Sequence, residues 1–428
     1  MSFAVIQPGT VSGMLTPPPS KSAAHRALIC AALAGGGTVN GVLPSEDMRA
    51  TLRAVQALGT PAEITGTQVH FGARQPLSPS EQAPVTVDCG ESGSTLRFFI
   101  PLFAAMGIDA VFTGSGRLPQ RPLGVYADCL PAHGMDFTPP ANGDSLPLRV
   151  TGRLRGGEYA LPGNVSSQFI TGLLFALPLC QEDSVIRLTS PLESAGYVDM
   201  TLAALQQAGI TVETTADGWR IPGGQAYRPA DYTVEADWSQ AAFLLAAGAL
   251  AGDVRLQGLS LPSAQGDSAA LALFRRFGAD IATDAGGIRC RRAPLHGIDI
   301  DAAQIPDLVP ILAVTAAFAE GVTHIFHAER LRIKESDRLA ATADGLRRLG
   351  ARVEETADGL RIHGGGPLTG GEVDGCNDHR IVMSMAVAAL RCSGPVTISD
   401  AQSVAKSWPG FFIDFIHLGG NAHVFDHR

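Results

Sequence analysis

Charge and aromatic side chains are scarce in this sequence. Asp, Glu, Lys and Arg make up 17% of its 428 residues, and Phe, Trp and Tyr make up 6%. Hydrophobic residues reach 45%, which excludes a disordered chain and indicates a well-buried globular protein. The formal charge of −9 excludes the basic excess of a non-specific nucleic-acid binder, although a few converging cations can still bind a small anion. A chain this long exceeds one ordinary core and predicts two or three domains.

Other features are missing altogether. The seven cysteines form no C-x-x-C pair, so neither a disulfide framework nor a zinc site is expected. The longest apolar runs, such as "AAFLLAAGALAG", are too short to span a bilayer, and the first residues, "MSFAVIQPGT", lack the basic and apolar regions of a signal peptide. No Walker A loop, dinucleotide fingerprint or G-x-S-x-G elbow occurs. We therefore expect a cytoplasmic protein with reduced thiols.

The sequence does contain a repeat. Six apolar segments, each opened by polar residues, recur roughly every 70 residues, and a fixed period indicates a repeat architecture. They read "SKSAAHRALICAAL", "ESGSTLRFFIPLFAAM", "SSQFITGLLFALPL", "DWSQAAFLLAAGAL", "IPDLVPILAVTAAFA" and "NDHRIVMSMAVAAL". Each has near its start a Ser or Asp of the kind that caps helices, namely Ser22, Ser94, Ser167, Ser239, Asp307 and Asp378. A strand-like run such as "GTVNGVL" or "GVTHIFHA" follows each helix.

A second helix in each repeat ends in glycine, in segments such as "LRAVQALG" and "LALFRRFG". The glycines expected to stop these helices in the left-handed conformation are Gly59, Gly134, Gly209, Gly278, Gly350 and Gly420. The sequence therefore predicts six copies of one α/β unit, arranged as two domains of three. The first helices are apolar nearly all round and are expected inside their domains, whereas the charged second helices are expected outside.

Several helices carry cations at the end where the helix dipole is already positive. Lys21 and Arg26 lie near the start of the first helix, and Arg121 precedes a helix expected to begin at Pro122. The other members of this group are Lys334, Arg338, Arg380 and Lys406. Each one alone is most simply a solvated surface charge, but the repetition predicts a functional site. Because helix N-termini and basic side chains both attract anions, we expect a polyanionic ligand.

Two carboxylates stand among these cations and are candidates for proton transfer. Asp307, in "QIPDLVP", can equally serve only as a helix cap. Glu335, in "IKESDR", can equally serve only as the ion-pair partner of Arg338. The spacing alone leaves these alternatives open.

Other polar groups at helix starts suit an anionic ligand as well. Ser166, Ser167 and Gln168 offer two hydroxyls and an amide, suited to a phosphate and a hydroxylated ring or merely to capping. Gly93 would let the backbone approach a ligand closely, although a simple turn explains a glycine equally well. His379 is most simply a hydrogen-bonded core histidine.

Eight motifs occur in order across nearly the whole chain: "PPSKSAAHRALI", "SGSTLR", "QRPLG", "VSSQF", "IPDLVP", "RIKESDR", "NDHR" and "AKSWP". Together they resemble the 3-phosphoshikimate 1-carboxyvinyltransferase (EPSP synthase) family. The resemblance implies a two-domain inside-out α/β barrel of six βαβαββ repeats, three per domain. It also implies domain I at residues 1–20 plus 236–428, domain II at residues 21–235, and an active site in the cleft between them.

The resemblance also implies an activity. Members of this family transfer the enolpyruvyl group of phosphoenolpyruvate to the 5-hydroxyl of shikimate 3-phosphate and release phosphate, a step of aromatic amino acid biosynthesis. Both substrates are small polyanions, as the misplaced cations require. The family implies a monomeric transferase that uses no metal or organic cofactor and has no nucleic-acid or membrane partner.

Motif by motif, the resemblance implies which residues contact each substrate. Those implied to bind phosphoenolpyruvate are Lys21, Gly93, Arg121, Gln168, Arg338, Arg380 and Lys406. Those implied to bind shikimate 3-phosphate are Lys21, Ser22, Arg26, Ser166, Ser167, Gln168, Ser194, Tyr197, Asp307, Arg330 and Lys334. Glu335 is implied to be the proton donor, and Asp307, with Lys21, the candidate base.

The chain departs from the family pattern at two positions. It reads "ESGST" where the family often has "NAGTA", so Glu91 replaces an asparagine near phosphoenolpyruvate. Arg330 replaces a frequent asparagine near the sugar phosphate and is expected to add a contact there.

Two other functions compete with this one. The sister enolpyruvyl transferase that acts on UDP-N-acetylglucosamine typically begins its first helix with a lysine–asparagine pair and uses a loop cysteine near its active-site arginine. Here the pair is Lys21–Ser22, and "TGSGRLPQRPLG" contains no cysteine. A non-catalytic anion-binding protein on the same scaffold would have no use for a proton relay of the kind implied above.

Overall fold

The chain divides into two compact units, each with its own hydrophobic core, in a computed structural model that describes residues 2–75 and 84–426. Unit 1 consists of Met1–Pro18 and Glu235–Arg428, and unit 2 is Pro19–Val234. Unit 1 is discontinuous because unit 2 is inserted between its two segments. These limits lie one or two residues from the boundaries expected after residues 20 and 235.

The six sheets formed by the described residues share one connectivity, in which a parallel pair of strands is extended by two antiparallel strands. The strand orders in unit 2 are β14 (Tyr232–Thr233), β3 (Gly37–Asn40), β5 (Gln68–Phe71), β4 (Ala62–Thr65); β6 (Val85–Asp88), β7 (Ala110–Thr113), β9 (Leu148–Gly152), β8 (Met135–Thr138); and β10 (Gly157–Leu161), β11 (Ser184–Leu188), β13 (Gly218–Ile221), β12 (Glu213–Thr215). Those in unit 1 are β2 (Val11–Leu15), β15 (Gly252–Leu256), β17 (Gly287–Arg291), β16 (Asp280–Asp284); β18 (Asp299–Asp301), β19 (Gly321–Phe326), β21 (Leu360–Gly364), β20 (Arg352–Glu355); and β22 (Gly371–Val373), β23 (Val396–Ser399), β1 (Ser2–Gln7), β24 (Asn421–Asp426).

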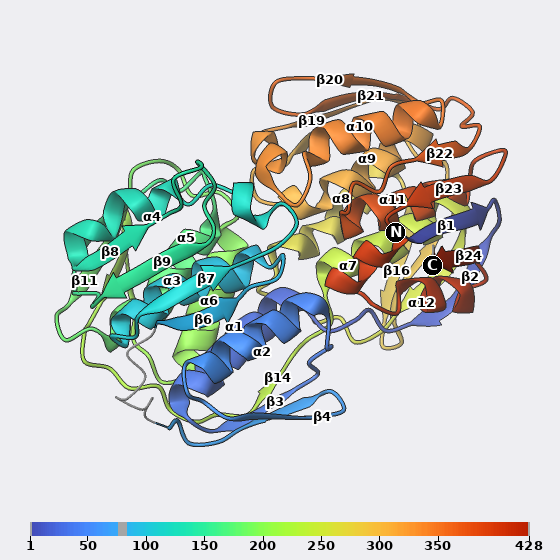
Figure 1. Ribbon diagram of the computed structural model, residues 1–428. Helices are drawn as coiled ribbons and strands as arrows, with labels where there is room; N and C mark the ends of the chain where they lie inside the picture. The colour runs from blue at the N-terminus through green and yellow to red at the C-terminus, as the bar shows by residue number, and fades with distance from the viewer. Residues whose placement is uncertain (1, 76–83, 427–428) are drawn as a thin grey trace. The chain divides into compact units, whose positions relative to one another are not determined.

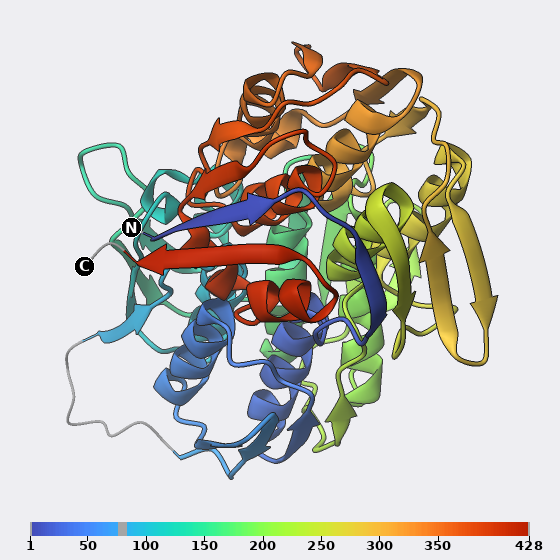
Figure 2. The same cartoon turned by 90° about the vertical axis from the view of Figure 1, so that its right-hand side faces the viewer.

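The predicted repeat is therefore present, but strands from distant parts of the chain complete some copies. β1 lies between β23 and β24, pairing Ala4 with Ile398 on one side and with Val424 on the other. Figure 2 shows this N-terminal strand alongside the red C-terminal one. Its alternating burial is that of a strand with one face on the core. β2 and β14 fill the first-strand place of their sheets in the same way.

The first helix of each repeat is an inner helix, as predicted. These helices are α1 (Lys21–Ala34), α3 (Gly93–Ala105) and α5 (Ser167–Ala176) in unit 2, and α7 (Trp238–Ala251), α9 (Val309–Phe318) and α11 (His379–Ala389) in unit 1. Every residue of α7 and α11 is buried, and α7, α9 and α11 pack against one another. An almost wholly apolar sequence leaves such a helix no face for solvent. Each unit is thus an inside-out α/β barrel, with sheets around helices (Figure 1).

The second helices are mostly amphipathic and lie outside. They are α2 (Glu46–Ala57), α4 (Gly124–Cys129), α6 (Ala195–Gln207), α8 (Ala270–Phe277), α10 (Arg338–Arg348) and α12 (Phe411–His417). The glycines predicted to stop them are left-handed in five of the six cases. The exception is Gly420, because the left-handed residue after α12 is Gly419, with φ +97°. Because Gly419 and Gly420 are adjacent, the sequence did not show which of them ends α12.

The capping residues differ from the prediction at several inner helices. Ser22, Ser94, Ser167 and Ser239 lie inside their helices, and the caps are Ser20, Ser92, Ser166 and Asp237. Each helix start contains two cap-forming residues close together, so the sequence could not separate them. α9 has no side-chain cap, because a 3₁₀ turn (Pro306–Leu308) containing Asp307 precedes it. Only Asp378 caps its helix, α11, as predicted.

The described helices include none that is both long enough and apolar enough to cross a membrane.

Candidate functional site

In unit 2 the first candidate residue, Lys21, begins α1. Its Nζ lies 2.7 Å from Oδ2 of Asp47, and the two side chains are 18% and 10% exposed. Asp47 is held in the first turn of α2 by the Ser45 cap, whose Oγ accepts a hydrogen bond from the Met48 N–H. The lysine is therefore held at the helix start by a half-buried ion pair rather than extended into solvent.

Arg26 is buried one turn further along α1. Its Nε donates to Oγ1 of Thr201, and its two Nη atoms donate to the carbonyls of Ser22 and Tyr197 at 2.6 Å. The guanidinium also lies 5.6 Å from the ring centroid of Phe98. Burial lowers the pKa of Arg26 to about 10, so it stays charged at neutral pH. Arg26 thus connects α1 to the start of α6, where the candidates Ser194 and Tyr197 lie.

The start of α3 is built around a close approach of backbone and guanidinium. A Cβ added at Gly93 would lie 2.5 Å from Nη1 of Arg121, so a larger residue there would displace the guanidinium. Arg121 is 8% exposed, and its carbonyl accepts a hydrogen bond from Ser145 Oγ. The prediction of a helix beginning at Pro122 is wrong, since α4 begins at Gly124 after the 3₁₀ turn Leu118–Gln120.

The amide of Gln168, in the first turn of α5, is held from both sides by α3. Its Oε1 accepts from Nη1 of Arg97 at 2.8 Å, and its Nε2 donates to Oγ of Ser94 at 2.9 Å. Arg97 also donates to the Pro122 carbonyl and lies 5.0 Å from the ring centroid of Phe169. These contacts fix which end of the amide faces which neighbour.

The remaining unit 2 candidates lie at the starts of α1, α5 and α6. Ser166 caps α5, and Ser167 is its first residue. Ser194 precedes α6 in the left-handed conformation, at φ 56°, and is buried. A non-glycine residue there is a strained feature of the kind that clusters at functional sites. Ser22 and Tyr197 are half-buried.

In unit 1 the central residue is Arg338, whose side chain is 3% exposed. Its guanidinium contacts three carboxylates: Asp378 at 2.8 Å, Asp307 at 3.0 Å and Glu335 at 2.7 Å. Burial disfavours its charge, but these carboxylates raise its pKa further above the usual range. The arginine is therefore permanently charged, and it arranges the three acids around itself.

Arg380 joins the starts of three inner helices. Its Nη1 donates to Ser239 Oγ on α7 and to the Asp307 carbonyl before α9, and its Nη2 donates to Asp307 Oδ2 at 3.0 Å. The residue itself lies in the first turn of α11, as the sequence predicts. Asp307 is 20% exposed and is an ion-pair partner of two arginines rather than a helix cap.

Glu335 and Lys334 complete this cluster of charges. Glu335 is 16% exposed, and its Oε2 lies 3.1 Å from Nδ1 of the buried His379. Burial works against the ionisation of Asp307, but Arg380, Lys334 and Arg338 lower its pKa well below the usual value. Lys334 stands before α10 rather than in its first turn, which begins at Arg338. A strongly ionised Asp307 and a carboxyl group next to a histidine are suited to different steps of proton transfer.

Lys406 and Arg330 lie in 3₁₀ segments of unit 1. Lys406 ends Ala401–Lys406 and is 3% exposed. Its Nζ donates to the carbonyl of Asn377, so it serves the start of α11 and not only that of α12. Arg330, in Glu329–Ile333, is buried and donates to the Ala303 carbonyl at 2.6 Å. The cations of unit 1 thus gather at the starts of α9, α10 and α11.

Glu91 packs against the loop that leads to Arg121. A Cβ at Gly116 would lie 2.4 Å from its carboxyl carbon, and Gly116 itself has φ +58°. Ser115 N–H donates to the Gly90 carbonyl at 2.8 Å in the same contact. Glu91 therefore packs against the 114–121 loop just before the start of α3.

Three residues of unit 1 lie close enough together to be considered as metal ligands. Glu335, Asp378 and His379 have donor atoms within 4.8 Å of one another. Arg338 contacts both carboxylates, and its guanidinium already supplies the positive charge that a cation would bring. This donor set is thus better suited to an ion-pair network than to a metal.

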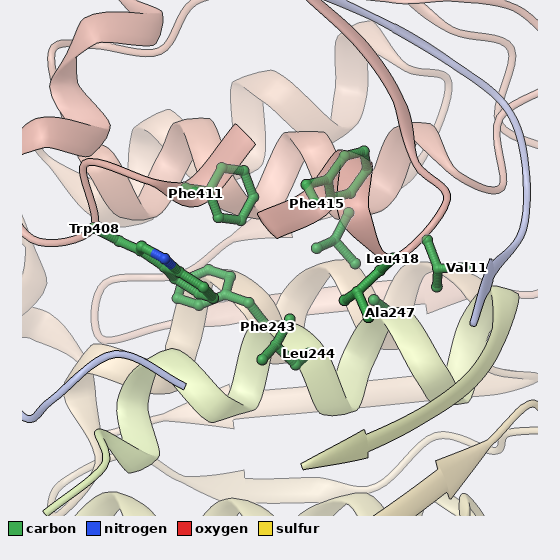
Figure 3. Close-up of a pocket in the computed structure, with 9 residues that line it drawn as sticks. Val11, Phe243, Leu244, Ala247, Trp408, Phe411, Phe415 and Leu418 are labelled. Carbon is green, nitrogen blue, oxygen red and sulfur yellow. The ribbon is translucent and has the colours of Figure 1, made fainter. Parts of the chain in front are cut away.

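An apolar pocket in unit 1 does not belong to these residues. It lies between α12 and α7 (Figure 3) and is lined by Val11, Phe243, Leu244, Ala247, Val387, Trp408, Phe411, Phe415 and Leu418. Its lining offers no charged group, so it does not suit a polyanion.

Sequence reasoning missed several residues that hold the candidates in place. They are Asp47, Arg97 and, as an ion-pair partner, Asp378, which the sequence indicated only as a cap. A buried charge within an apolar helix, as in "STLRFFIP", was the one available signal for Arg97.

Comparison with known proteins agrees with the family resemblance of the sequence motifs. The family model for EPSP synthase (3-phosphoshikimate 1-carboxyvinyltransferase) matches residues 5–415. Relatives named 3-phosphoshikimate 1-carboxyvinyltransferase include those of Clostridium acetobutylicum, 44% identical with 99% of both chains covered, and Clostridioides difficile, 41% identical with 97% of both chains covered.

Solved structures agree. The EPSP synthase of Acinetobacter baumannii matches with a TM-score of 0.83 at 29% identity over 100% of both chains. The enolpyruvyl transferase NikO of Streptomyces tendae matches with a TM-score of 0.80 at 19% identity over 100% of this chain and 99% of that one, a likeness of fold alone.

Proposed function

Because the chain belongs to the EPSP synthase (3-phosphoshikimate 1-carboxyvinyltransferase) family, we propose that it transfers the enolpyruvyl group of phosphoenolpyruvate to the 5-hydroxyl of shikimate 3-phosphate and releases phosphate. The protein is a transferase by this membership. The observation that supports the reaction most strongly is the cluster in which Arg338 and Arg380 share Asp307 at the starts of three helices. Such a cluster combines anion binding with groups able to move protons.

The family motifs assign the residues that would bind each of the two substrates. Lys21, Arg121 and Gln168 in unit 2 would contact phosphoenolpyruvate, together with Arg338, Arg380 and Lys406 in unit 1. Shikimate 3-phosphate would contact the serines of "VSSQ" and "SAGY", Tyr197, Arg26 and Ser22 in unit 2, and Asp307, Arg330 and Lys334 in unit 1. Each unit carries only part of the set that the family motifs imply for each substrate.

The reaction needs one proton delivered to the methylene carbon of phosphoenolpyruvate and one removed from the attacking hydroxyl. Glu335 is proposed as the donor, because its carboxyl oxygen lies 3.1 Å from Nδ1 of His379, a group with which it can exchange a proton. Asp307 is proposed as the base, with Lys21, because its partly exposed carboxylate is deprotonated and lies among the cations that would bind the substrates. Each transfer contributes about 10²–10⁴ in rate in typical enzymes.

The cations would stabilise the tetrahedral intermediate and the departing phosphate. Arg338 and Arg380 are buried and already oriented by Asp307, so little reorganisation is needed as negative charge develops. Preorganised charge of this kind is usually a large term in catalysis.

One assay tests the proposal and separates its rivals. Purified protein is mixed with phosphoenolpyruvate and either shikimate 3-phosphate or UDP-N-acetylglucosamine, and phosphate release is measured. Release with shikimate 3-phosphate is expected. Release with the nucleotide sugar alone would identify the sister activity, and release with neither would favour an anion-binding protein.

The cytoplasmic location and the monomeric state expected from the sequence stay predictions. Size-exclusion chromatography with light scattering tests the second.

A further inference from the structure

A buried chain of hydrogen bonds runs through three helices of unit 2. His25 on α1 contacts Thr51 on α2, with Nδ1 and Oγ1 2.7 Å apart. Thr51 contacts Thr95 on α3 at 2.8 Å, and Thr95 Oγ1 donates to Ser92 Oγ at 2.7 Å. All four side chains belong to residues that are at most 1% exposed. None of them is assigned to a substrate above.

The direction of this chain follows from counting protons. Thr95 has one hydroxyl proton and gives it to Ser92, so its oxygen accepts from Thr51. Thr51 has then used its own proton, so its oxygen accepts from His25. His25 is therefore the tautomer with hydrogen on Nδ1 and a lone pair on Nε2.

The surroundings of His25 are consistent with this tautomer. Nε2 is buried and has no hydrogen-bond partner within residues 2–75 and 84–426. The ring packs edge-on against Phe98 of α3, with ring centroids 6.1 Å apart. Burial, and next the charges of Lys21 and Arg26, lower the pKa of His25 well below the usual value, so the ring stays neutral. Only Nδ1–H makes a polar contact.

The chain ends at the residue that caps α3. Ser92 Oγ accepts both the Thr95 hydroxyl and, at 3.2 Å, the Thr95 N–H. With both lone pairs used, its own proton must point away from the chain. Ser92 directly precedes Gly93, on which the Arg121 guanidinium lies.

We propose that His25 is a positioning residue, which through Thr51 and Thr95 fixes Ser92 and with it the start of α3 beneath Arg121. This inference rests on the proposed function, because it treats that helix start as part of the phosphoenolpyruvate site. Three side-chain hydrogen bonds that run from His25 toward Ser92 restrict the orientation of the Ser92 hydroxyl. This hydroxyl and the helix N–H groups are then held ready before the anion arrives.

Thr51→Val tests the chain at its middle, because valine keeps the shape and removes the hydroxyl. We expect the KM for phosphoenolpyruvate to rise roughly 3- to 10-fold with kcat changed less, since the loss is one of ground-state positioning. Thr51→Ser keeps the hydroxyl and should restore the wild-type KM.

Thr60→Val is the matched control in the same unit. Thr60 is 1% exposed, and its Oγ1 donates to the Ala32 carbonyl near the far end of α1, at 3.1 Å. This variant should lose stability but keep its KM. Equal KM values for the two valine variants, or a Thr51→Val enzyme with lowered stability and unchanged KM, would overturn the proposal.

His25 itself is tested by two amides and by its NMR spectrum. The amide nitrogen of His25→Asn can take the place of Nδ1, whereas that of His25→Gln reaches the place of Nε2. The asparagine variant should therefore keep the KM, and the glutamine variant should raise it. A ¹⁵N spectrum of the wild-type imidazole should show hydrogen on Nδ1 only.

Hydrogen on Nε2, or no difference between the two amide variants, would contradict the chain. The spectrum needs no turnover. It therefore decides the hydrogen-bond direction even if the wild-type protein releases no phosphate, the result that would instead reject the proposed function.

Discussion

Arg338 shows, at the scale of single residues, how this protein keeps charge inside a core. Its guanidinium is almost fully buried and contacts Asp307, Glu335 and Asp378. Removing one member of such a buried group leaves the others without compensation, which costs more than an exposed ion pair would. Substitutions in this cluster therefore change folding and binding together, and the two effects have to be measured separately.

Asp307 makes the stability of unit 1 depend on pH. Arg380, Lys334 and Arg338 outweigh burial and hold its pKa well below the usual value. The folded state therefore binds this proton only at lower pH than the unfolded chain, so the stabilisation is complete above about pH 4 and is lost below it. In urea unfolding, Asp307→Asn should be less stable than wild type at neutral pH, and the difference should shrink as the pH falls through about 4. A difference independent of pH would contradict this.

Gly93→Ala should act through Arg121 rather than through the fold. The new Cβ would lie 2.5 Å from Nη1, at the flexible end of the arginine, so the guanidinium must move while the helix remains. We expect the KM for phosphoenolpyruvate to rise about 10-fold. Gly124→Ala is the control, since nothing lies within 4 Å of the added carbon. An unchanged KM for phosphoenolpyruvate would count against the position of Arg121 at the site.

Glu335→Gln keeps the shape of the side chain and removes its acidic proton. If Glu335 is the proton donor, the kcat of Glu335→Gln should fall about 10²–10⁴-fold. Lys21→Ala should abolish turnover. Circular dichroism should show that both variants are folded. Near-normal turnover would refute the assigned roles.

At the scale of elements, the inner helices were predictable and their neighbours only in part. Runs such as "AAFLLAAGAL" have no polar face, and α7 is accordingly buried throughout. The exact caps were not predictable, because Ser20 and Ser22, or Ser92 and Ser94, are equally good capping residues in the sequence. Which of them ends up as the cap depends on tertiary packing.

The outer helix α2 offers a test of capping. Ser45 is 2% exposed and accepts a hydrogen bond from Met48 N–H at 3.4 Å, which sets the turn carrying Asp47. Ser45→Ala should lower the free energy of unfolding by about 1 kcal/mol, and Ser45→Asp, which can still cap, should not. Chemical denaturation measures both. Equal loss in the two variants would show that the cap is not what Ser45 contributes.

At the scale of the whole molecule, the period of the sequence was enough to predict six repeats and two groups of three. The permuted strands were not predictable, because nothing in β1 or β14 indicates that it completes a sheet begun elsewhere in the chain. Partners such as Asp47 for Lys21, or Arg97 for Gln168, lie far apart in sequence and became apparent only from the fold. The spacing of residues along a chain identifies where helices start, but it does not show which helix starts lie next to one another in the fold.

The proposed function assigns phosphoenolpyruvate to cations of both units. The KM for phosphoenolpyruvate, measured by phosphate release at saturating shikimate 3-phosphate, tests it in two single variants, Arg121→Gln in unit 2 and Lys406→Gln in unit 1. The account predicts a raised KM in both. A raised KM in only one, with the other indistinguishable from wild type, would contradict it.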